Sequence, residues 1–466
     1  MIRMDKNPSL NADLYDKSDL NSILLHASKL TNKTLRDFID NGEIIIGGTN
    51  TKGMFGQIVE SGYFQIENNN SPRPDFQEAG IELKVTPIKK IGSGLVSKER
   101  LILGIINYDD VPKRHFNIFL DKDSHILIVF YLWNEDMDIY DYPFLKVVDW
   151  KPTKEELRII QDDWNVIEGY VMRGEAHLLS ERHTKYLAAC TKGAGHGKDL
   201  RSQPFSSEPA KQRALSFKVS FMTDLFHSHP DINDVLSTAN PDSKAIAENW
   251  SDKVTFEDYV IGLYKPFIGR TCAEIESMLR IELNSDSKQY YYTLSLAMAG
   301  VLGKKRIKEF EQAGILVKTI RIRTDGKSKE SMSFPHIRYD EMVTQSWEES
   351  DFYSQLDHEF FSPVFEFTSK DTKKQGKKEL RFKGAFFWTL SDEEFEIVHE
   401  VWEDTKSRIL AKDFDHFVKM TDNRISHIRP HGKNSLDLTT YDGEPVKKLA
   451  FWLNSTYIEK KVRKNL

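Results

Sequence analysis

An internal repeat constrains the fold of this chain more than any other feature of its sequence. Phe76–Lys84 reads FQEAGIELK and Phe310–Lys318 reads FEQAGILVK, so five of these nine positions are identical. One such match can arise by chance, but four more follow in the same order, which predicts that one fold has been duplicated. They pair Ser97-Lys98-Glu99 with Ser328-Lys329-Glu330, Thr153–Trp164 with Ser391–Trp402, Lys185–Gly193 with Ser426–Gly432, and Ala214–Phe217 with Leu449–Trp452.

The length fits this duplication, because 466 residues exceed what one ordinary hydrophobic core accommodates. After His227 the chain becomes rich in Ser, Asp, Asn and Pro and loses its periodicity, which is typical of a linker. We therefore expect a first domain over residues 1–228, a linker over 229–253 and a second domain over 254–466.

Composition excludes several classes of protein. The chain is 39% hydrophobic and 29% charged, as soluble globular proteins are, and no apolar run is long enough to span a bilayer. The first twenty residues are polar and do not resemble a signal peptide. The two cysteines, Cys190 and Cys272, are far apart, which argues against a disulfide scaffold or a structural zinc site. We expect a cytoplasmic protein.

Strands and helices alternate along the first half, which predicts an α/β (mixed α+β) fold. Helical spacing covers residues 21–39, and Thr153 with Glu156 forms a capping box at the start of a long helix. Apolar runs at 101–108 and 125–131 predict buried strands. A further short strand is expected over Gly80–Val85, bounded by Gly80 and by Pro87.

That short strand carries the candidate chemistry. Residues i and i+2 of a strand point the same way, so Glu82 and Lys84 share one face while Leu83 faces the core. With Asp75 a few positions upstream, two carboxylates and a lysine converge, which suits a divalent cation and an attacking water. The pattern favours metal-dependent hydrolysis of phosphodiesters. The simpler alternative is an exposed strand face held by salt bridges.

The second copy of this strand differs where the chemistry resides. Glu309 stands in the position of Asp75 and could still bind a metal, whereas Leu316 replaces Glu82 and cannot. Lys318 is retained in the position of Lys84. We expect the second copy to fold like the first and not to cut.

Taken together, these residues resemble the MutH-type DNA endonucleases. The likeness rests on Lys52-Gly53 with Glu60, on Asp75 with Glu82-Leu83-Lys84, and on Trp164 with the loop from Tyr186 to Lys192. The two-copy layout is similar to the GATC-specific two-domain type II restriction endonucleases of the same superfamily, the Sau-three-A type. The resemblance implies two tandem restriction-endonuclease-like domains, each a mixed central sheet flanked by helices, and DNA hydrolysis with Mg²⁺.

The resemblance also implies roles for individual residues. Asp75 and Glu82 would bind Mg²⁺, helped by the Leu83 carbonyl, and Lys84 would orient or deprotonate the attacking water. Glu60 would lie beside the metal as a ligand or a supporting group. Two further lysines of the family pattern, expected near the active site, match Lys52 and Lys122.

DNA reading would fall to a loop that in MutH carries an Arg-Pro-Lys core. The first copy has Thr191-Lys192-Gly193 at this place, and the second has Arg429-Pro430-His431, which is closer to the family pattern. The alternatives are a plain flexible loop in the first copy and a simple turn in the second. The candidate DNA contacts are Lys52, Lys192, His196, Lys198 and Arg201 in the first copy and Arg429, His431, Lys433 and Asn434 in the second.

Three functions compete at this stage. The first is a restriction endonuclease that makes double-strand cuts at GATC, with the second domain binding another copy of the site. The second is a repair-type nicking enzyme activated by protein partners, and the third is a DNA-binding regulator with a dead active site. For the first we expect double-stranded DNA, two sites per active complex, a monomer that dimerises on DNA, and a cognate DNA methyltransferase as partners. The net charge of −6 does not exclude DNA binding, because a local basic stripe suffices.

Overall fold

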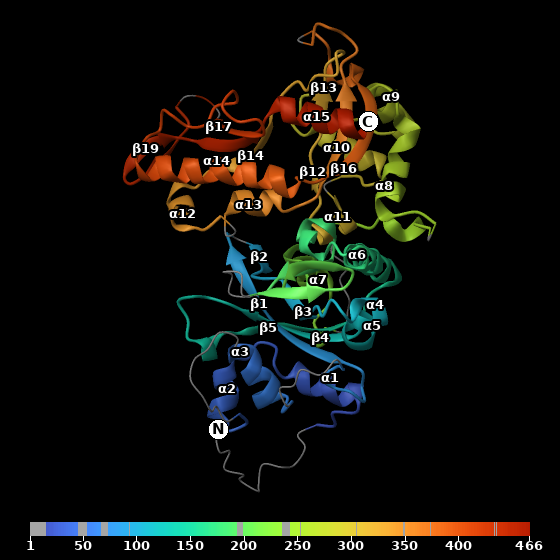
Figure 1. Cartoon of the computed structure of the whole chain (residues 1–466), viewed down its shortest axis with the longest axis vertical. Helices are drawn as coiled ribbons and strands as arrows, with labels where there is room; N and C mark the ends of the chain where they lie inside the picture. Colours follow the sequence, from blue (N-terminus) through green and yellow to red (C-terminus); the bar gives the residue numbers. More distant parts are fainter. Residues whose placement is uncertain are drawn as a thin grey trace. The chain divides into compact units, whose positions relative to one another are not determined.

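The computed structural model divides the chain into two compact units, Met1–Pro241 with Glu311–Ala313 and Asp242–Phe310 with Gly314–Leu466 (Figure 1). Each unit is described by itself. The structure describes residues 15–44, 54–66, 73–92, 94–192, 199–234, 243–251, 253–303, 305–347, 350–372, 374–432, 434 and 436–466.

The first unit is built on a mixed sheet of four strands in the order β2-β1-β4-β5. β1 runs parallel to β4, and the pairs β1–β2 and β4–β5 are antiparallel. Apolar residues of β1, β4 and β5 pack with the N-terminal helices into one buried core. The strands are β1 (Glu82–Ile91), β2 (Gly94–Ser97), β4 (Ile126–Leu132) and β5 (Phe144–Trp150), and the helices are α1 (Leu20–Ser28), α2 (Leu35–Asp40), α3 (Met54–Gln57) and the π-helix η1 (Ile58–Tyr63).

The strand predicted to end before Pro87 continues to Ile91, so that expectation was wrong. Pro87 lies within the parallel ladder opposite Tyr131, and its carbonyl accepts the N–H of Lys98 just beyond the end of β2. Proline has no N–H to donate, but Pro87 lies just past the end of the β1–β2 pairing. Its presence therefore costs no hydrogen bond within the β1–β2 ladder.

A second layer of the first unit is a three-stranded antiparallel sheet, β3-β9-β6, beside the hairpin β7–β8. The long helix α6 begins with the predicted capping box of Thr153 and Glu156 and buries Trp164 completely. The elements are β3 (Leu101–Ile105), β6 (Leu187–Thr191), β7 (Leu200–Gln203), β8 (Ser206–Lys211), β9 (Arg213–Phe217), α4 (Val111–Arg114), α5 (Asn117–Asp123), α6 (Lys154–Met172) and α7 (Val219–Ser228).

Asp163 joins α6 to β6. Its buried carboxylate accepts the backbone N–H groups of Lys185, Tyr186 and Leu187 at 2.6, 2.7 and 2.9 Å. Burial raises the pKa of Asp163 to about 6, in opposition to these hydrogen bonds and to the nearby Lys185. The helix thereby fixes the start of the strand that leads to Lys192.

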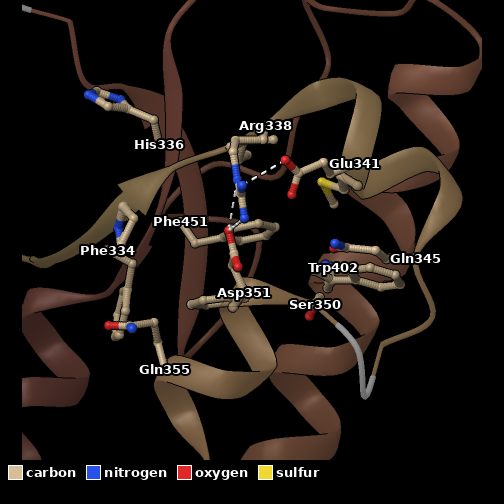
Figure 2. Close-up of a pocket in the computed structure, with 14 residues that line it drawn as sticks. Phe334, His336, Arg338, Glu341, Gln345, Ser350, Asp351, Gln355, Trp402 and Phe451 are labelled. Atoms are coloured by element: carbon tan, nitrogen blue, oxygen red, sulfur yellow. Dashed lines mark hydrogen bonds and ion pairs between the residues drawn. The ribbon is translucent and has the colours of Figure 1, made fainter. Parts of the chain in front are cut away.

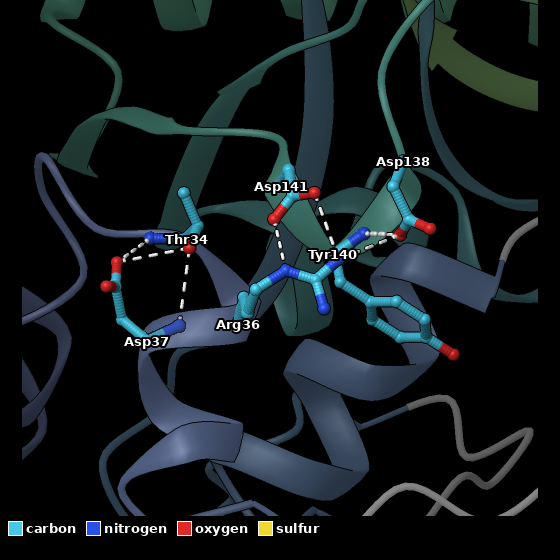
Figure 3. A network of polar contacts seen from close by, with 6 residues as sticks. All are labelled: Thr34, Arg36, Asp37, Asp138, Tyr140 and Asp141. Carbon is cyan, nitrogen blue, oxygen red and sulfur yellow. Dashed lines mark hydrogen bonds and ion pairs between the residues drawn. The ribbon is translucent and has the colours of Figure 1, made fainter.

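A polar network at the surface holds α2 (Figure 3). Thr34 and Asp37 form a capping box at its start, and Arg36 makes a two-point contact with Asp141, with Nη2 2.9 Å from Oδ2. Asp138 lies 3.6 Å from the same guanidinium group. Because these side chains are well exposed, we expect the network to orient the helix rather than to stabilise the fold strongly.

The second unit repeats this plan. Its first sheet joins β12 and β13, both parallel to β15, with β16 antiparallel on the other side, and its second sheet has the order β14-β20-β17. The strands are β10 (Ser243–Lys244), β11 (Arg306–Ile307), β12 (Leu316–Val317), β13 (Ile320–Ile322), β14 (Met332–His336), β15 (Phe360–Glu366), β16 (Arg381–Trp388), β17 (Ser426–Pro430), β18 (Leu438–Tyr441), β19 (Glu444–Lys447) and β20 (Leu449–Leu453).

Matching elements occur in the same order in both units. β12 with β13 corresponds to β1, β15 and β16 to β4 and β5, and β14-β20-β17 to β3-β9-β6. The helix α14 opens with the capping box of Ser391 and Glu394 and buries Trp402, as α6 does with Trp164. The helices are α8 (Phe256–Tyr264), α9 (Cys272–Leu279), α10 (Tyr290–Met298), α11 (Lys308–Ala313), α12 (Tyr339–Thr344), α13 (Asp351–Leu356), α14 (Asp392–Leu410) and α15 (Ser455–Asn465).

Parts of the segment expected to be a linker pack against structured elements. The Asp231 carboxylate accepts the N–H of Val147 at 2.8 Å and the hydroxyl of Thr31 at 3.0 Å in the first unit. Ser243 and Lys244 pair as β10 with β11 in the second.

Candidate active site

The start of β1 brings together Asp75, Glu82 and Lys84. The Asp75 N–H donates to Glu82 Oε2 at 3.2 Å, and the Leu83 N–H donates to Asp75 Oδ2 at 3.0 Å. Lys84 Nζ lies 2.6 Å from Glu82 Oε1, and Lys122 Nζ lies 3.4 Å from the same oxygen. The Glu82 side chain is only 2% exposed, so a carboxylate at this depth requires the cations around it.

A tight turn sets this arrangement. Gly80 adopts φ +68°, a conformation that favours glycine, and the N–H groups of Gly80 and Ile81 both donate to the Phe76 carbonyl. The turn folds Asp75 back beside Glu82 although seven positions separate them. Ile81 and Leu83 are buried, as the alternation of the strand predicts.

Glu60 belongs to the same electrostatic group but comes from a different element. It lies in the π-helix η1, a geometry that is rare and frequently occurs at functional sites. Burial raises the pKa of Glu60 to about 7, helped by the Asp75 and Glu82 carboxylates and opposed by Lys84 and Lys122. A carboxyl group poised in this way takes up a proton when no cation is present.

Asp123, which the sequence analysis did not single out, is a further member of the group. It is the last residue of α5, it is 3% exposed, and its Oδ1 has no hydrogen-bond partner among the described residues. Burial raises the pKa of Asp123 to about 7, with Glu82 adding to the rise and Lys84 opposing it. The signal in the sequence was the Asp-Lys-Asp run before an apolar strand, of which only the lysine was chosen.

Lys84 is held in its charged form by its neighbours. Burial alone lowers the pKa of this ammonium group, but the carboxylates of Glu82, Asp123 and Asp75 outweigh it and raise the pKa above the ordinary value. Removing a proton from Lys84 is therefore harder in this arrangement than in water, and proton transfer through Lys84 depends on a change in the surrounding charge.

The oxygen atoms of Asp75, Glu82 and Leu83 can be compared with the ligands that a divalent cation requires. Across the described ranges, no three His, Cys, Asp or Glu side chains converge closely enough to form a metal cage. Two carboxylates, Asp75 and Glu82, do converge, with the Leu83 backbone beside them. Few protein oxygens completed by water molecules are what Mg²⁺ prefers, so the residues fit this ion. Glu60 is coupled to the pair by charge and is not part of a closer cluster.

The predicted DNA contacts of the first unit are only partly within the described residues. Lys52, His196 and Lys198 lie outside them. Lys192 is exposed at the end of β6, where its N–H donates to the Gln212 carbonyl at 2.9 Å. Arg201 is exposed on β7, and its guanidinium group donates to the Leu200 carbonyl at 3.0 Å. Both cations can therefore reach a ligand at the surface.

In the second unit, Arg429 is an exposed cation at the end of β17. Its guanidinium carbon lies 3.7 Å from the centre of the Trp452 ring, which fixes the plane of the group. The ring of His431 lies 5.0 Å from Trp452 and 4.9 Å from His336. Burial lowers the pKa of His431, and the neighbouring His336, Arg429 and Lys288 lower it further. Asn434 is exposed, and Lys433 lies outside the described residues.

A small pocket in the second unit is unrelated to this chemistry (Figure 2). It has a volume of about 40 Å³, and its walls include the rings of Phe334, Trp402 and Phe451. Arg338 at its edge is neutralised by Glu341 and Asp351, with contacts of 2.6 Å to each. A space of this size holds little more than water, and it contains none of the predicted catalytic residues.

A mixed sheet whose first long strand carries Glu82 and Lys84 at its buried end, with Asp75 folded beside them, defines a nuclease of the restriction-endonuclease-like class, present here as two tandem domains. The comparisons agree with this class. The family described as DNA mismatch repair enzyme MutH matches the chain twice, over residues 64–163 and 301–400.

The chain is 30% identical to the type II restriction enzyme Sau3AI of Staphylococcus aureus, in an alignment that covers 88% of this chain and 92% of that protein. It is 24% identical to the DNA mismatch repair protein MutH of Shewanella woodyi over 182 residues, which cover 39% of this chain and 78% of that protein. The chain belongs to the family of the type II restriction enzyme Sau3AI. It is thus an enzyme, a site-specific deoxyribonuclease of a restriction system. No helix in the described part of the chain is long and apolar enough to cross a membrane.

Proposed function

We propose that the protein is an Mg²⁺-dependent restriction endonuclease that cuts both strands of DNA at a short palindromic site, expected to be GATC. The first unit is the cutting domain, and the second is a catalytically inactive domain that binds DNA and acts as an allosteric effector. The observation that carries this proposal is the complete set of Asp75, Glu82 and Lys84 in the first unit and its loss in the second.

Asp75 and Glu82 hold the cation, with the Leu83 carbonyl as a further ligand. A bound Mg²⁺ supplies neutralisation of the phosphate charge and a water molecule of lowered pKa. With Asp75 and Glu82 engaged as ligands, the hold of Glu82 on the Lys84 proton would weaken. As an ammonium group Lys84 would orient the attacking water, and only after releasing its own proton to solvent could the neutral amine accept one from that water.

Glu60 and Lys122 support this centre from either side. Glu60 is raised in pKa beside Asp75 and Glu82 and acts as a ligand or a supporting group of the cation. Lys122 lies 3.4 Å from Glu82 and limits the negative charge that the phosphate meets. The remaining family lysine, Lys52, is assigned to the same neighbourhood on resemblance alone.

DNA recognition is assigned to Lys192, Lys198 and Arg201 in the first unit and to Arg429, His431 and Lys433 in the second. Of these, Lys192, Arg201 and Arg429 are exposed cations. Arginine is the stronger reader of base edges, because its planar group forms two parallel hydrogen bonds with guanine. The stacking of Arg429 on Trp452 supports such a role by fixing the guanidinium plane before DNA arrives.

The extent of the relatives favours restriction over repair. The restriction enzyme matches 88% of the chain, whereas the mismatch repair protein matches 39%. A second DNA-binding unit is useful to an enzyme that engages two sites. We include in the proposal two DNA sites per active complex, a monomer that dimerises on DNA, a partner DNA methyltransferase, and the cytoplasm as location.

Cleavage of plasmids tests the function directly. The purified protein is incubated with Mg²⁺ or EDTA and with plasmids that carry many or no GATC sites. Discrete double-strand fragments that require both Mg²⁺ and GATC are expected. Nicked circles alone would support the repair-type activity instead, and fragments from the plasmid without GATC would refute the assigned site.

A further inference from the structure

The second unit preserves the backbone of the active-site strand. Gly314 adopts φ +68°, the same value as Gly80. The Ile315 N–H donates to the Phe310 carbonyl, as the Ile81 N–H donates to the Phe76 carbonyl in the first unit. The Leu316 N–H donates to the Glu359 carbonyl at 2.9 Å, and the Lys318 N–H donates to the Phe361 carbonyl at 2.9 Å. These two bonds fix the register of the strand on β15. Lys318 therefore stands in the place of Lys84.

The acidic surroundings of Lys84 are not reproduced around Lys318. Asp357 stands in the place of Asp123, but it does not raise the pKa of Lys318. Leu316 replaces Glu82, and Glu309, in the place of Asp75, is 3% exposed. The Glu309 carboxylate accepts the N–H groups of Ile246 and Ala247 at 3.0 and 2.8 Å, so it serves the backbone and is closed to a ligand. The same shift along the chain places Leu294 of α10 where the first unit has Glu60.

Lys318 is consequently a half-buried cation without an anion. Its Nζ donates to the Ser333 carbonyl at 3.3 Å and lies 5.1 Å from the centre of the Phe334 ring. Burial lowers the pKa of this ammonium group, and among the described residues no carboxylate compensates. An ammonium group has three hydrogens to donate, and one carbonyl at a long distance leaves most of that capacity unused.

We propose that Lys318 binds a phosphate oxygen of the DNA backbone, so that the former active site of the second unit is a metal-independent contact to DNA. In the first unit, three carboxylates around Lys84 repel a phosphate until a cation neutralises them. Around Lys318 that repulsion is absent, and the lysine alone attracts the phosphate. The inference rests on the proposed role of the second unit as a DNA-binding effector and deepens it.

The contact has a consequence for metal dependence. The second unit binds DNA in EDTA, whereas the first unit needs the divalent cation to bring a phosphate to its own lysine. A phosphate contact carries no sequence information, so Lys318 contributes equally to binding at specific and at unrelated sites.

The test measures DNA binding by the full-length protein in EDTA, by fluorescence anisotropy over about 50 to 200 mM salt. Lys318→Gln is expected to weaken binding roughly three- to tenfold and to reduce the slope of log K against log salt by about 1. Lys318→Arg, which keeps the charge, is expected to preserve the slope. Lys327→Gln, at an exposed lysine of the same unit that lies 3.7 Å from Asp325, is the matched control and is expected to leave binding in EDTA unchanged, because its charge is already paired.

Thermal unfolding of each variant separates a lost contact from a lost fold. An unchanged slope in a folded Lys318→Gln protein would overturn the inference. Arg429→Ala then shows which idea has failed. If Arg429→Ala weakens binding and Lys318→Gln does not, only the phosphate contact is refuted. If neither variant affects binding, the effector role of the second unit is refuted as well.

Discussion

Glu82 and Leu316 occupy the same position in two copies of one strand. The N–H of Glu82 donates to the His125 carbonyl at 3.0 Å, and that of Leu316 donates to the Glu359 carbonyl at 2.9 Å. Each pairs with the first residue of the neighbouring parallel strand, Ile126 or Phe360. The backbone is thus conserved between the units while the side chain changes from a carboxylate to a hydrocarbon. This single difference removes the central carboxylate from the second copy of the strand.

Replacing Glu82 by alanine should abolish cleavage while DNA binding remains. The substitution removes one of the two converging carboxylates, and we expect a loss of at least about 10²-fold in the cleavage rate. The rate is measured with Mg²⁺ on plasmid DNA, and binding is measured by anisotropy. Leu316→Ala is the matched control and should cut at the rate of the unaltered protein. Near-normal cutting by Glu82→Ala would show that the site is assigned wrongly.

Asp123→Asn should shift the pH dependence of cleavage to lower pH. Asp123 helps to raise the pKa of Lys84, so its neutralisation lowers the pKa of that ammonium group. Whether Lys84 acts as a cation or as a base, the limb that it controls then moves to lower pH. The measurement is the single-turnover rate across pH. Asp121→Asn, an exposed neighbour paired with Arg114, is the control. A profile that stays in place would reduce Asp123 to a structural residue.

In the metal-free protein, the carboxyl groups of Glu60 and Asp123 should make the folded state less stable as pH rises from about 4.5 to about 7. The pKa values of Glu60 and Asp123 are both raised to about 7, so the folded state binds more protons than the unfolded state in this interval. Their contribution is complete below the ordinary values of 4.5 and 3.8 and is lost as pH rises through 7.

Thermal unfolding in EDTA at about pH 5 and about pH 8 measures this effect, which we expect to be a few degrees. Other carboxylates of the protein respond to pH in the opposite direction. The change in unfolding temperature between the two pH values is therefore compared between the unaltered protein and Glu60→Gln. Glu60→Gln should be less sensitive to pH than the unaltered protein, and Mg²⁺ should restore more stability at high pH when Glu60 is present. Equal sensitivity in both proteins would contradict the raised pKa of Glu60.

Arg429→Ala should weaken DNA binding by the second unit. The group is exposed and held flat against Trp452, so its loss removes both a charge and a preset plane. We expect roughly a three- to tenfold loss of affinity and less stimulation of cleavage by a second site. Arg429→Lys retains the charge without the plane and should recover only part of the effect. Unchanged kinetics on two-site plasmids would count against an effector role.

Asp163→Ala should destabilise the first unit by about 2–4 kcal/mol, because the N–H groups of Lys185, Tyr186 and Leu187 at the entry to β6 lose their acceptor. Arg36→Ala, which removes the exposed network of Figure 3, should leave the unfolding temperature almost unchanged. Calorimetry on both variants gives the comparison. If the two variants melt alike, the three hydrogen bonds of Asp163 contribute less than their burial indicates.

The sequence was informative where one periodicity or one cap decides a structure. The capping box at Thr153 was predicted from spacing, and the pairing of Thr153–Trp164 with Ser391–Trp402 predicted a second helix of the same kind. Both are confirmed, and both tryptophans are buried. The extent of β1 was not predicted, because Pro87 ends a strand only when its missing N–H falls within a ladder, and the sequence does not show where the partner strand stops.

In the candidate site, too, some residues could be predicted from the sequence and others could not. Glu82 and Lys84 could be paired from the strand period of two. Asp123 could not, because its approach to Lys84 depends on the position of α5 against the sheet. The π-helix at Glu60 was likewise hidden, since its extra residue per turn has no signature in the local composition.

The capture of Glu309 by Ile246 and Ala247 also bears on evolution. A single reversion of Leu316 to glutamate returns one carboxylate, but the other is already committed to holding two backbone N–H groups and cannot be withdrawn without leaving them unsatisfied. On the proposed function, a return of the second domain to catalysis would take at least two coupled changes, the first of which brings no benefit. The proposed loss of cutting would then be hard to reverse, and the surface of this domain would be free to diverge under selection for binding alone.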